Sequence, residues 1–308
     1  MTAATVALRF QIGARTLFAL SRRLQRVPMS LEDALAGTSP LLRPLADEAD
    51  GYSITSLAVH QLDALVAGHG HLQPFVRQRY ARSYADLRQD FEAYWASFSA
   101  KTRSTLKRKR RKLEDAAGGA LDLRFFHAPV DVDTFYRDAR AVSEKTYQER
   151  LMGSGFPEGQ EAIERLRALA ASDSLRGWIL YLHGAPSSYL FAPAEGDVLL
   201  YSHLGYDPEH AALSPGTVLQ VEALRQVMGR DRFALFDFTE GDGQHKRLFG
   251  TASVDCVDLL LLRRTFANRA CVGALGLFDG AVAAGKAGVR RLGIEGAFRG
   301  LRRGRAAA

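Results

Sequence analysis

A short segment around Glu240 brings together the side chain types that acid and base chemistry requires. An apolar stretch with the pattern of a strand carries Asp237, and Glu240 follows it in a loop with two glycines. His245 and Lys246 come directly after that loop. Carboxylates, an imidazole and an ammonium group at the end of a strand can exchange protons and stabilise charge during a reaction. The alternative is a solvated loop with a satisfied Asp cap, but its dense polar groups make this segment the best candidate site in the chain.

A second segment has the pattern of a strand that leads into the first turn of a helix. Tyr206 and Asp207 stand at the predicted strand end. The helix would open with Ser214, Pro215, Gly216 and Thr217. A helix N-terminus presents unpaired N–H groups and the positive end of the helix dipole, and it can therefore hold a phosphate or pyrophosphate. Ser as a cap and Pro in the first turn are also ordinary helix-start chemistry, and taken alone the segment favours that simpler interpretation.

Two ring side chains alternate on the strand that precedes this helix. Tyr201 and His203 are two residues apart and should therefore point to the same face. His203 is a candidate to line a groove for an acceptor. A packed or hydrogen-bonded histidine is the commoner state, so both interpretations stay open.

Three segments together resemble a known family. Their sequences are SFSAKTRSTLKRKRRKLED, YSHLGYDPEHAALSPGTVLQVEAL and FALFDFTEGDGQHKRLFG. In this order they are similar to the GNAT-superfamily acyltransferases of cellulose and exopolysaccharide biosynthesis, a FemAB-like subgroup related to the holdfast-polysaccharide N-acetyltransferases of stalked bacteria. The similarity extends over residues 85–263. The resemblance implies an α/β GNAT fold with a mixed sheet, and two GNAT-like halves of which the first is degenerate.

The same resemblance implies a reaction and roles for the candidate residues. An acyl group would pass from acetyl-CoA to the amine of an amino sugar, in an exopolysaccharide or its lipid-linked precursor, without a metal ion. Asp237 or Glu240 would be the base, with His245 as a substitute, and Lys246 would hold a phosphate or the developing negative charge. Tyr206 would protonate the leaving thiolate. Ser214, Pro215, Gly216 and Thr217 would bind the cofactor, and His203, Asp207 and His245 would contact the substrate.

Two other functions remain alternatives. One is a catalytically inactive GNAT scaffold that serves as a regulatory module, binding a cyclic dinucleotide or docking to a membrane. The other is an aminoacyl-tRNA-dependent transferase acting on a peptidoglycan precursor. Relatives of that kind carry a long helical hairpin in the second half, and the sequence has no uninterrupted heptad pattern for one.

Positive charge is concentrated in two stretches. The formal net charge is +7, and much of the excess lies in residues 101–112 and 290–305. Such stretches are usually solvated, and a frayed helix or disorder is the simplest expectation for the tail. Anionic inner-membrane lipid would suit either stretch, and a cyclic dinucleotide would suit the Arg-rich tail. Nucleic acid is the least favoured partner because aromatic residues precede the first basic run and do not interleave with it.

The predicted elements give the chain a three-part organisation. Phe91, Tyr94, Trp95 and Phe98 have the spacing of one helical face. Ser99 should cap the basic helix that follows, which ends near two glycines. We then expect strands, helices and a crossover in the order βββ-α-β-α-β, with residues 197–206 as the third strand. The predicted parts are 1–118, a degenerate GNAT-like half, 119–265, a GNAT-like domain, and 266–308, a basic tail.

Composition limits the classes of protein that remain possible. The longest strongly apolar stretch, residues 257–262, is far shorter than the roughly 20 residues of a membrane span. Arginines interrupt every apolar run near the N-terminus, so we expect no export signal. Cys256 and Cys271 lack metal-ligand spacing. These features predict a cytoplasmic protein, in peripheral contact at most with the inner membrane.

Overall fold

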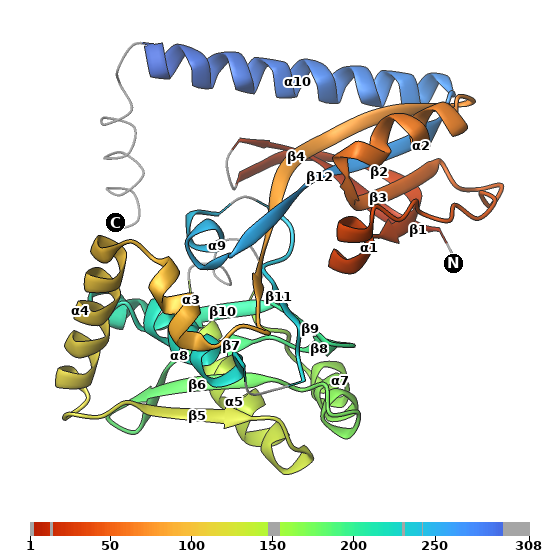
Figure 1. Ribbon diagram of the computed structural model, residues 1–308. Coiled ribbons are helices and arrows are strands. Elements are labelled where there is room, and N and C mark those ends of the chain that lie inside the picture. The colour runs from red at the N-terminus through yellow and green to blue at the C-terminus, as the bar shows by residue number, and fades with distance from the viewer. Residues whose placement is uncertain (1–2, 13–14, 147–154, 230–231, 242, 292–308) are drawn as a thin grey trace. The chain divides into compact units, whose positions relative to one another are not determined.

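The computed structural model describes residues 3–12, 15–146, 155–229, 232–241 and 243–291 (Figure 1). Its contacts divide the chain into two units: residues 1–79 with 256–308, and residues 80–255. The basic helix therefore belongs to the second unit. The three-part division at residues 118 and 265 stays a prediction.

The first unit is built on long strands. They are β1 (Ala4–Ile12), β2 (Arg15–Pro28), β3 (Gly51–Ala58), β12 (Ala252–Arg263) and β4 (Leu72–Asp86), adjacent in that order. Shorter helical segments connect them: α1 (Leu31–Ala36), η1 (Val59–Gln61) and α2 (Leu62–Gly68). At Gly51 the backbones of β3 and β12 lie close together, since a Cβ at this position would be 2.1 Å from the carbonyl oxygen of Leu261.

The last described helix, α10 (Phe266–Arg291), also belongs to the first unit. Cys271 and Leu275 are buried in a cluster with Phe10 of β1. Of the two expectations for the tail, disorder or a frayed helix, disorder is therefore wrong up to Arg291, because this apolar stripe gives the helix a surface to pack on. The Arg-rich residues 292–308 lie outside the described residues.

The second unit contains an antiparallel sheet in the order β10-β7-β6-β5. Its strands are β5 (Asp122–Phe126), β6 (Gly177–Leu182), β7 (Ala185–Phe191) and β10 (His203–Tyr206). The short strands β8 (Ala194–Glu195), β9 (Val198–Leu200) and β11 (Leu235–Asp237) continue from β4 in the order β4-β11-β9-β8. Strand β11 is parallel to β9 and antiparallel to β4, so the predicted mixed α/β arrangement is confirmed.

The strand predicted at residues 197–206 is instead two strands in different sheets. Strand β9 pairs with β11, and β10 pairs with β7. The change of partner occurs within two residues, because the Tyr201 N–H donates to the Asp237 carbonyl (2.8 Å) and the Ser202 N–H donates to the Phe191 carbonyl (3.1 Å).

Helices cover both faces of the antiparallel sheet (Figure 1). Alternate side chains of β6 point to opposite faces, so Trp178 packs with α8 (Pro215–Val227), whereas Ile179 packs with α5 (Val132–Ser143). The helix α7 (Gln160–Ala171) joins α5 on its side, and α3 (Phe91–Ser97) and α4 (Ala100–Ala116) join α8. The remaining elements of this unit are η2 (Pro129–Asp131), η3 (Pro208–Leu213) and α9 (Gln244–Phe249).

Capping residues set the start of the helices that border the site. Asp90 caps α3 by accepting from the Ala93 N–H, and Ser99 caps α4 by accepting from the Thr102 N–H at 3.1 Å. The aromatic face of α3 is buried as predicted, with Tyr94 only 1% exposed. Sequence patterns therefore located both helices correctly.

Candidate functional site

The first turn of α8 contains the residues predicted to bind the cofactor. Ser214 precedes it with a φ of 56°, a left-handed conformation that is uncommon for a residue with a side chain. Pro215 occupies the first helical turn, where its missing backbone N–H costs no hydrogen bond because that group would have no acceptor within the helix. The 13-residue helix directs its positive end toward this point. The N–H groups of Thr217 and Val218 donate to the Ser214 carbonyl at 3.1 and 3.2 Å, which leaves the Gly216 N–H as the donor of this turn.

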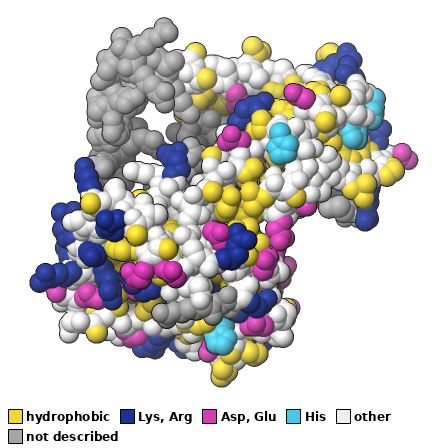
Figure 2. Space-filling model, in the orientation of Figure 1, with side chains coloured by type: hydrophobic (Ala, Val, Ile, Leu, Met, Phe, Trp, Pro, Cys, Tyr) yellow, Lys and Arg dark blue, Asp and Glu magenta, His cyan; other side chains and the backbone are white. Residues whose placement is uncertain are grey.

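Two lysines of α4 reach the same turn. The Lys109 ammonium lies 3.4 Å from the Thr217 hydroxyl oxygen, and Lys112 donates to the Ala212 carbonyl at 3.0 Å. Figure 2 shows Lys and Arg side chains gathered on the part of the surface where Figure 1 places α4. A helix N-terminus supplemented by two ammonium groups can hold a phosphorylated ligand.

The strand that leads to this turn has one edge without a partner strand. Among the described strands, β10 is the last of its sheet and pairs on one side only, with β7. Gly216 allows α8 to lie close beside it, since a Cβ there would meet the Leu204 side chain at 3.0 Å. An unpaired strand edge offers N–H and C=O groups to an extended ligand that carries amides.

Asp237 is buried at the end of β11. Its carboxylate has no exposed surface and accepts two hydrogen bonds from Arg82 of β4, at 3.1 Å and 2.5 Å. It also accepts from the Thr239 N–H at 2.7 Å. A carboxylate in this setting cannot take a proton directly from a bound amine. The geometry gives Asp237 the role of fixing the loop that follows.

That loop is held in a strained conformation. Thr239 has a φ of 60°, and a β-branched residue in the left-handed region costs about 1 to 3 kcal/mol. Its hydroxyl donates to the Tyr201 carbonyl at 3.4 Å, where the chain leaves β9. The Lys246 ammonium donates to the carbonyls of Thr239, at 3.5 Å, and Glu240. Such strain persists only where surrounding contacts enforce it, which is typical of functional loops.

The titratable groups around this loop have shifted pKa values. Partial burial lowers the pKa of Lys246; Asp237 and Glu240 oppose this effect, and Arg82 adds to it. Partial burial and the charge of Lys246 lower the pKa of His245, which keeps its imidazole neutral at neutral pH. The His245 ring lies 5.7 Å from the Tyr201 ring. Neutral imidazole can accept a proton, so His245 and the exposed Glu240 are the groups positioned to act as a base.

Asp207 and His203 occupy different surroundings. Asp207 is buried and accepts from the Lys145 ammonium at 2.7 Å and from the Glu209 N–H at 3.0 Å. Burial alone would raise the pKa of Asp207, but these hydrogen bonds and the charges of Lys145 and His210 hold it below its ordinary value. The His203 ring packs near the rings of Phe156 and Phe191, and burial lowers its pKa.

The predicted site residues therefore form two groups connected by β10. Asp237, Glu240, His245 and Lys246 surround the loop after β11. Tyr206, Asp207, Ser214, Pro215, Gly216 and Thr217 surround the start of α8, and Tyr206 is 42% exposed there. The described residues include no group of three or more His, Cys, Asp or Glu arranged to hold a metal ion.

Sequence patterns did not connect four cations with the two groups of site residues. Arg82 and Lys145 neutralise Asp237 and Asp207, and nothing in their local sequence indicates it. Lys109 and Lys112 were visible as members of a basic helix. Their spacing of three residues places them on one helical face, which is the only local signal that they act together.

Comparison with known proteins adds the family context. Residues 100–247 match the family model of the acetyltransferase (GNAT) domain, a little less than half of the chain. The fold is GNAT-like, as predicted. The C-terminal domain of a protein assigned as a lysylphosphatidylglycerol synthetase from Agrobacterium fabrum superposes with a TM-score of 0.50 and 11% identity, covering 74% of this chain and 72% of that one.

A second solved structure, FemX, has a TM-score of 0.49 and 10% identity, and covers 84% of this chain and 88% of that one. A search of curated proteins found no match. At 11% identity the likeness to the Agrobacterium domain bears on the fold alone. Among the described residues, no helix combines the length and the apolar character needed to cross a membrane.

Proposed function

We propose that the chain is an N-acyltransferase that moves an acetyl group from acetyl-CoA to the amine of an amino sugar, in an exopolysaccharide or its lipid-linked precursor. The observation that carries this proposal is the unpaired edge of β10 leading into the start of α8 beside Lys109 and Lys112. Acetyl-CoA combines a pyrophosphate with an extended, amide-containing arm. The helix start suits the first part and the strand edge suits the second.

Residues of both groups then have roles in direct transfer. The acceptor amine attacks the thioester carbonyl carbon and loses a proton to His245 or Glu240. Backbone N–H groups of the β10 edge stabilise the oxyanion until the C–S bond breaks. Tyr206, which is partly exposed beside α8, gives its proton to the departing thiolate. Asp237 and Lys246 hold the loop that positions the base.

The acceptor would bind where His203 and Asp207 flank β10. His203 offers a partly buried ring of lowered pKa, neutral at neutral pH, against which the face of a sugar can pack. The Lys145–Asp207 pair provides charged groups for hydroxyl recognition. Support for exopolysaccharide as the pathway comes from the sequence resemblance of residues 85–263. A cytoplasmic location, and contact of the tail with anionic membrane or a cyclic dinucleotide, remain expectations from the sequence.

Calorimetric titration with acetyl-CoA tests the proposal. We expect saturable binding by the wild-type protein and binding at least tenfold weaker by the Lys109→Ala/Lys112→Ala variant, because two ammonium groups leave the phosphate site. Lys101→Ala is the matched control, since Lys101 is an exposed lysine on the first turn of the same helix. Absence of binding at millimolar acetyl-CoA, or equal binding by all three proteins, would contradict the proposal.

A second candidate function is aminoacyl transfer from tRNA to a peptidoglycan precursor. The basic surface of α4 favours it, because a polyanion gains from a row of cations that a small ligand cannot reach. Product formation that depends on charged tRNA and not on acetyl-CoA would establish this alternative. An inactive regulatory scaffold is the third possibility, and it predicts that Glu240, His245 and Lys246 can all be replaced without loss of function.

A further inference from the structure

We propose that a pocket between α3, α4 and α8 binds the adenine nucleotide end of the acyl donor. The inference rests on the proposed function, because it extends the phosphate site at the start of α8 along the flank of that helix. Thr217 belongs to both places, since it lies beside Lys109 and also lines the pocket.

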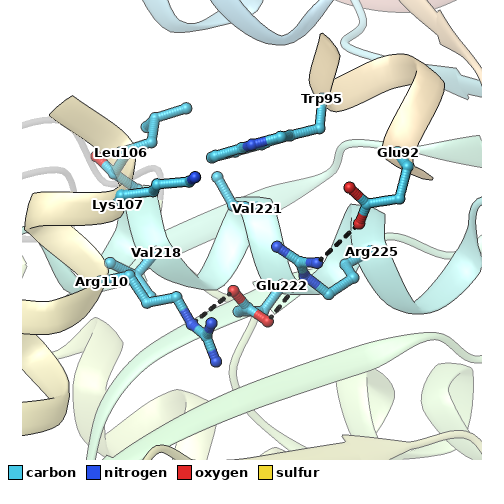
Figure 3. Close-up of a pocket in the computed structure, with 10 residues that line it drawn as sticks. Glu92, Trp95, Leu106, Lys107, Arg110, Val218, Val221, Glu222 and Arg225 are labelled. Atoms are coloured by element: carbon cyan, nitrogen blue, oxygen red, sulfur yellow. Dashed lines mark ion pairs between the residues drawn. The ribbon is translucent and has the colours of Figure 1, made fainter. Parts of the chain in front are cut away.

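The pocket is small and is enclosed by side chains of the three helices (Figure 3). Its volume is about 250 Å³. It is lined by Glu92, Trp95, Leu106, Lys107, Arg110, Thr217, Val218, Val221, Glu222 and Arg225. From Thr217 to Arg225 the helix α8 rises by about 12 Å. This size suits a single ring system with its attached phosphate, and is too small for a long chain.

One wall of the pocket is an aromatic ring fixed in place. Trp95 stacks on Phe91, with ring centroids 5.8 Å apart and planes inclined by 24°. Phe98 contacts Trp95 edge-on at 5.8 Å. Val221 of α8 lies below the indole ring in Figure 3, and Val218 adds a second apolar lining residue. A fixed indole at the wall of a pocket is suited to a nucleobase, because every base has a face that stacks.

Lys107 is the lining cation that is left to meet a ligand. Glu222 forms ion pairs with Arg110 at 3.2 Å and with Arg225 at 3.4 Å. Arg225 also pairs with Glu92 at 3.6 Å, and Arg110 with Glu114 of α4 at 3.0 Å. Among the described residues Lys107 forms no ion pair, and its ammonium points into the pocket in Figure 3. An ammonium group in this position favours an anion and disfavours the amine of the acceptor.

The aromatic wall lies outside the part of the chain that matches the GNAT model. That match begins at residue 100, whereas α3 ends at Ser97. The pocket is thus formed by placing an additional aromatic helix beside α4 and α8. Both donors considered above, CoA and the 3′ end of tRNA, carry an adenosine with phosphate attached, so the shared chemistry is an adenine nucleotide.

Tryptophan fluorescence gives a direct test with the full-length protein. The sequence contains two tryptophans, and Trp178 is 0% exposed, so a ligand that stacks in the pocket should quench the signal of Trp95. We expect saturable quenching by 3′,5′-ADP, which lacks the pantetheine arm. The Trp95→Phe variant should lose this response.

Calorimetry with matched ligands separates this inference from the proposed function. Lys107→Ala, at an exposed position, and Trp95→Ala should each weaken CoA binding by about 5- to 100-fold. Neither change should alter the affinity for 4′-phosphopantetheine, which lacks the nucleotide. Lys101→Ala is again the control. If CoA binds and both variants bind it as tightly as the wild type, the pocket inference is overturned while the proposed function stands. If CoA does not bind at all, the proposed function is overturned, and the pocket inference falls with it if 3′,5′-ADP also fails to quench Trp95.

The source of the nucleotide is distinguished by competition. CoA that displaces 3′,5′-ADP identifies a CoA donor. An RNA hairpin ending in CCA that displaces it, when CoA does not, identifies tRNA as the donor and keeps the nucleotide pocket. Displacement by a cyclic dinucleotide alone would overturn the assignment of the pocket to the donor.

Discussion

The start of α8 and the loop after β11 both contain charged residues, but they differ in where those charges are satisfied. At α8, Lys109 and Lys112 make only long or single contacts with neutral oxygens. In the loop, Asp237 and Lys246 direct their hydrogen bonds to other groups of the same segment or to Arg82. The first region therefore retains capacity to bind an external anion.

The polar groups of the loop are already hydrogen-bonded and those at the start of α8 are less so, and the two regions should therefore contribute differently to stability and to ligand binding. Polar groups that are already paired and buried contribute stability and geometry, because a ligand would have to break their existing bonds. Exposed cations beside a helix start contribute affinity. Substitutions in the loop should therefore affect folding and turnover, whereas those at α8 should affect binding of the donor.

Removal of the buried carboxylate should have the largest effect. Asp237→Ala removes the carboxylate that pairs with the buried Arg82 guanidinium, and we expect the free energy of unfolding to fall by about 3 to 5 kcal/mol. Urea denaturation of both proteins measures this difference. Replacing both partners by apolar residues should recover much of the loss. A decrease below 1 kcal/mol for Asp237→Ala would show that the buried charges of the loop do not contribute the stability that distinguishes it from the start of α8.

The next effect concerns turnover at the same loop. His245→Gln should lower kcat by about 100-fold, because the proton of the attacking amine loses its acceptor. The pKa of His245 lies below its ordinary 6.5, so the wild-type rate should be steady at neutral pH and decline as the pH falls through that lowered pKa. The variant should lack this acidic decline.

Glu240→Gln is the matched variant for this measurement. A rate that falls only with Glu240→Gln, together with loss of the acidic limb, would transfer the role of base to Glu240. Both variants should bind acetyl-CoA as tightly as the wild type, because neither residue contacts the start of α8 in the described structure.

Local sequence patterns were sufficient for the elements that border the site. The periodicity of α3, the Ser99 cap of α4 and the Ser-Pro-Gly start of α8 are signals carried within a few residues. They could therefore be located without knowledge of the rest of the chain. The division of residues 197–206 into two strands could not, because it depends on which strand lies beside Tyr201.

The same limit applies to the chemistry. Sequence patterns identified Asp237 as a polar residue at a strand end, but its partner Arg82 lies 155 positions earlier. Nothing between them indicates that they pair. The sequence therefore left Asp237 and Glu240 as equal candidates for the base, and the tertiary structure buries the first of them. Glu240 and the predicted substitute His245 remain. The strained backbone of Thr239 was also invisible, since a threonine in this position has no distinctive local signature.

Backbone strain offers the smallest and most direct comparison of the two regions. Ser214 and Thr239 have nearly equal φ values of 56° and 60°, one at each region. Glycine adopts this conformation freely, so Thr239→Gly should raise the free energy of unfolding by about 0.5 to 1 kcal/mol, and Ser214→Gly by less, because serine is not β-branched. Thermal unfolding of the two variants measures the gain. If the Thr239→Gly variant is more stable than the wild type and has a lower kcat, the strain serves catalysis. If the two variants gain equal stability and kcat is unchanged, the strain only shapes the loop.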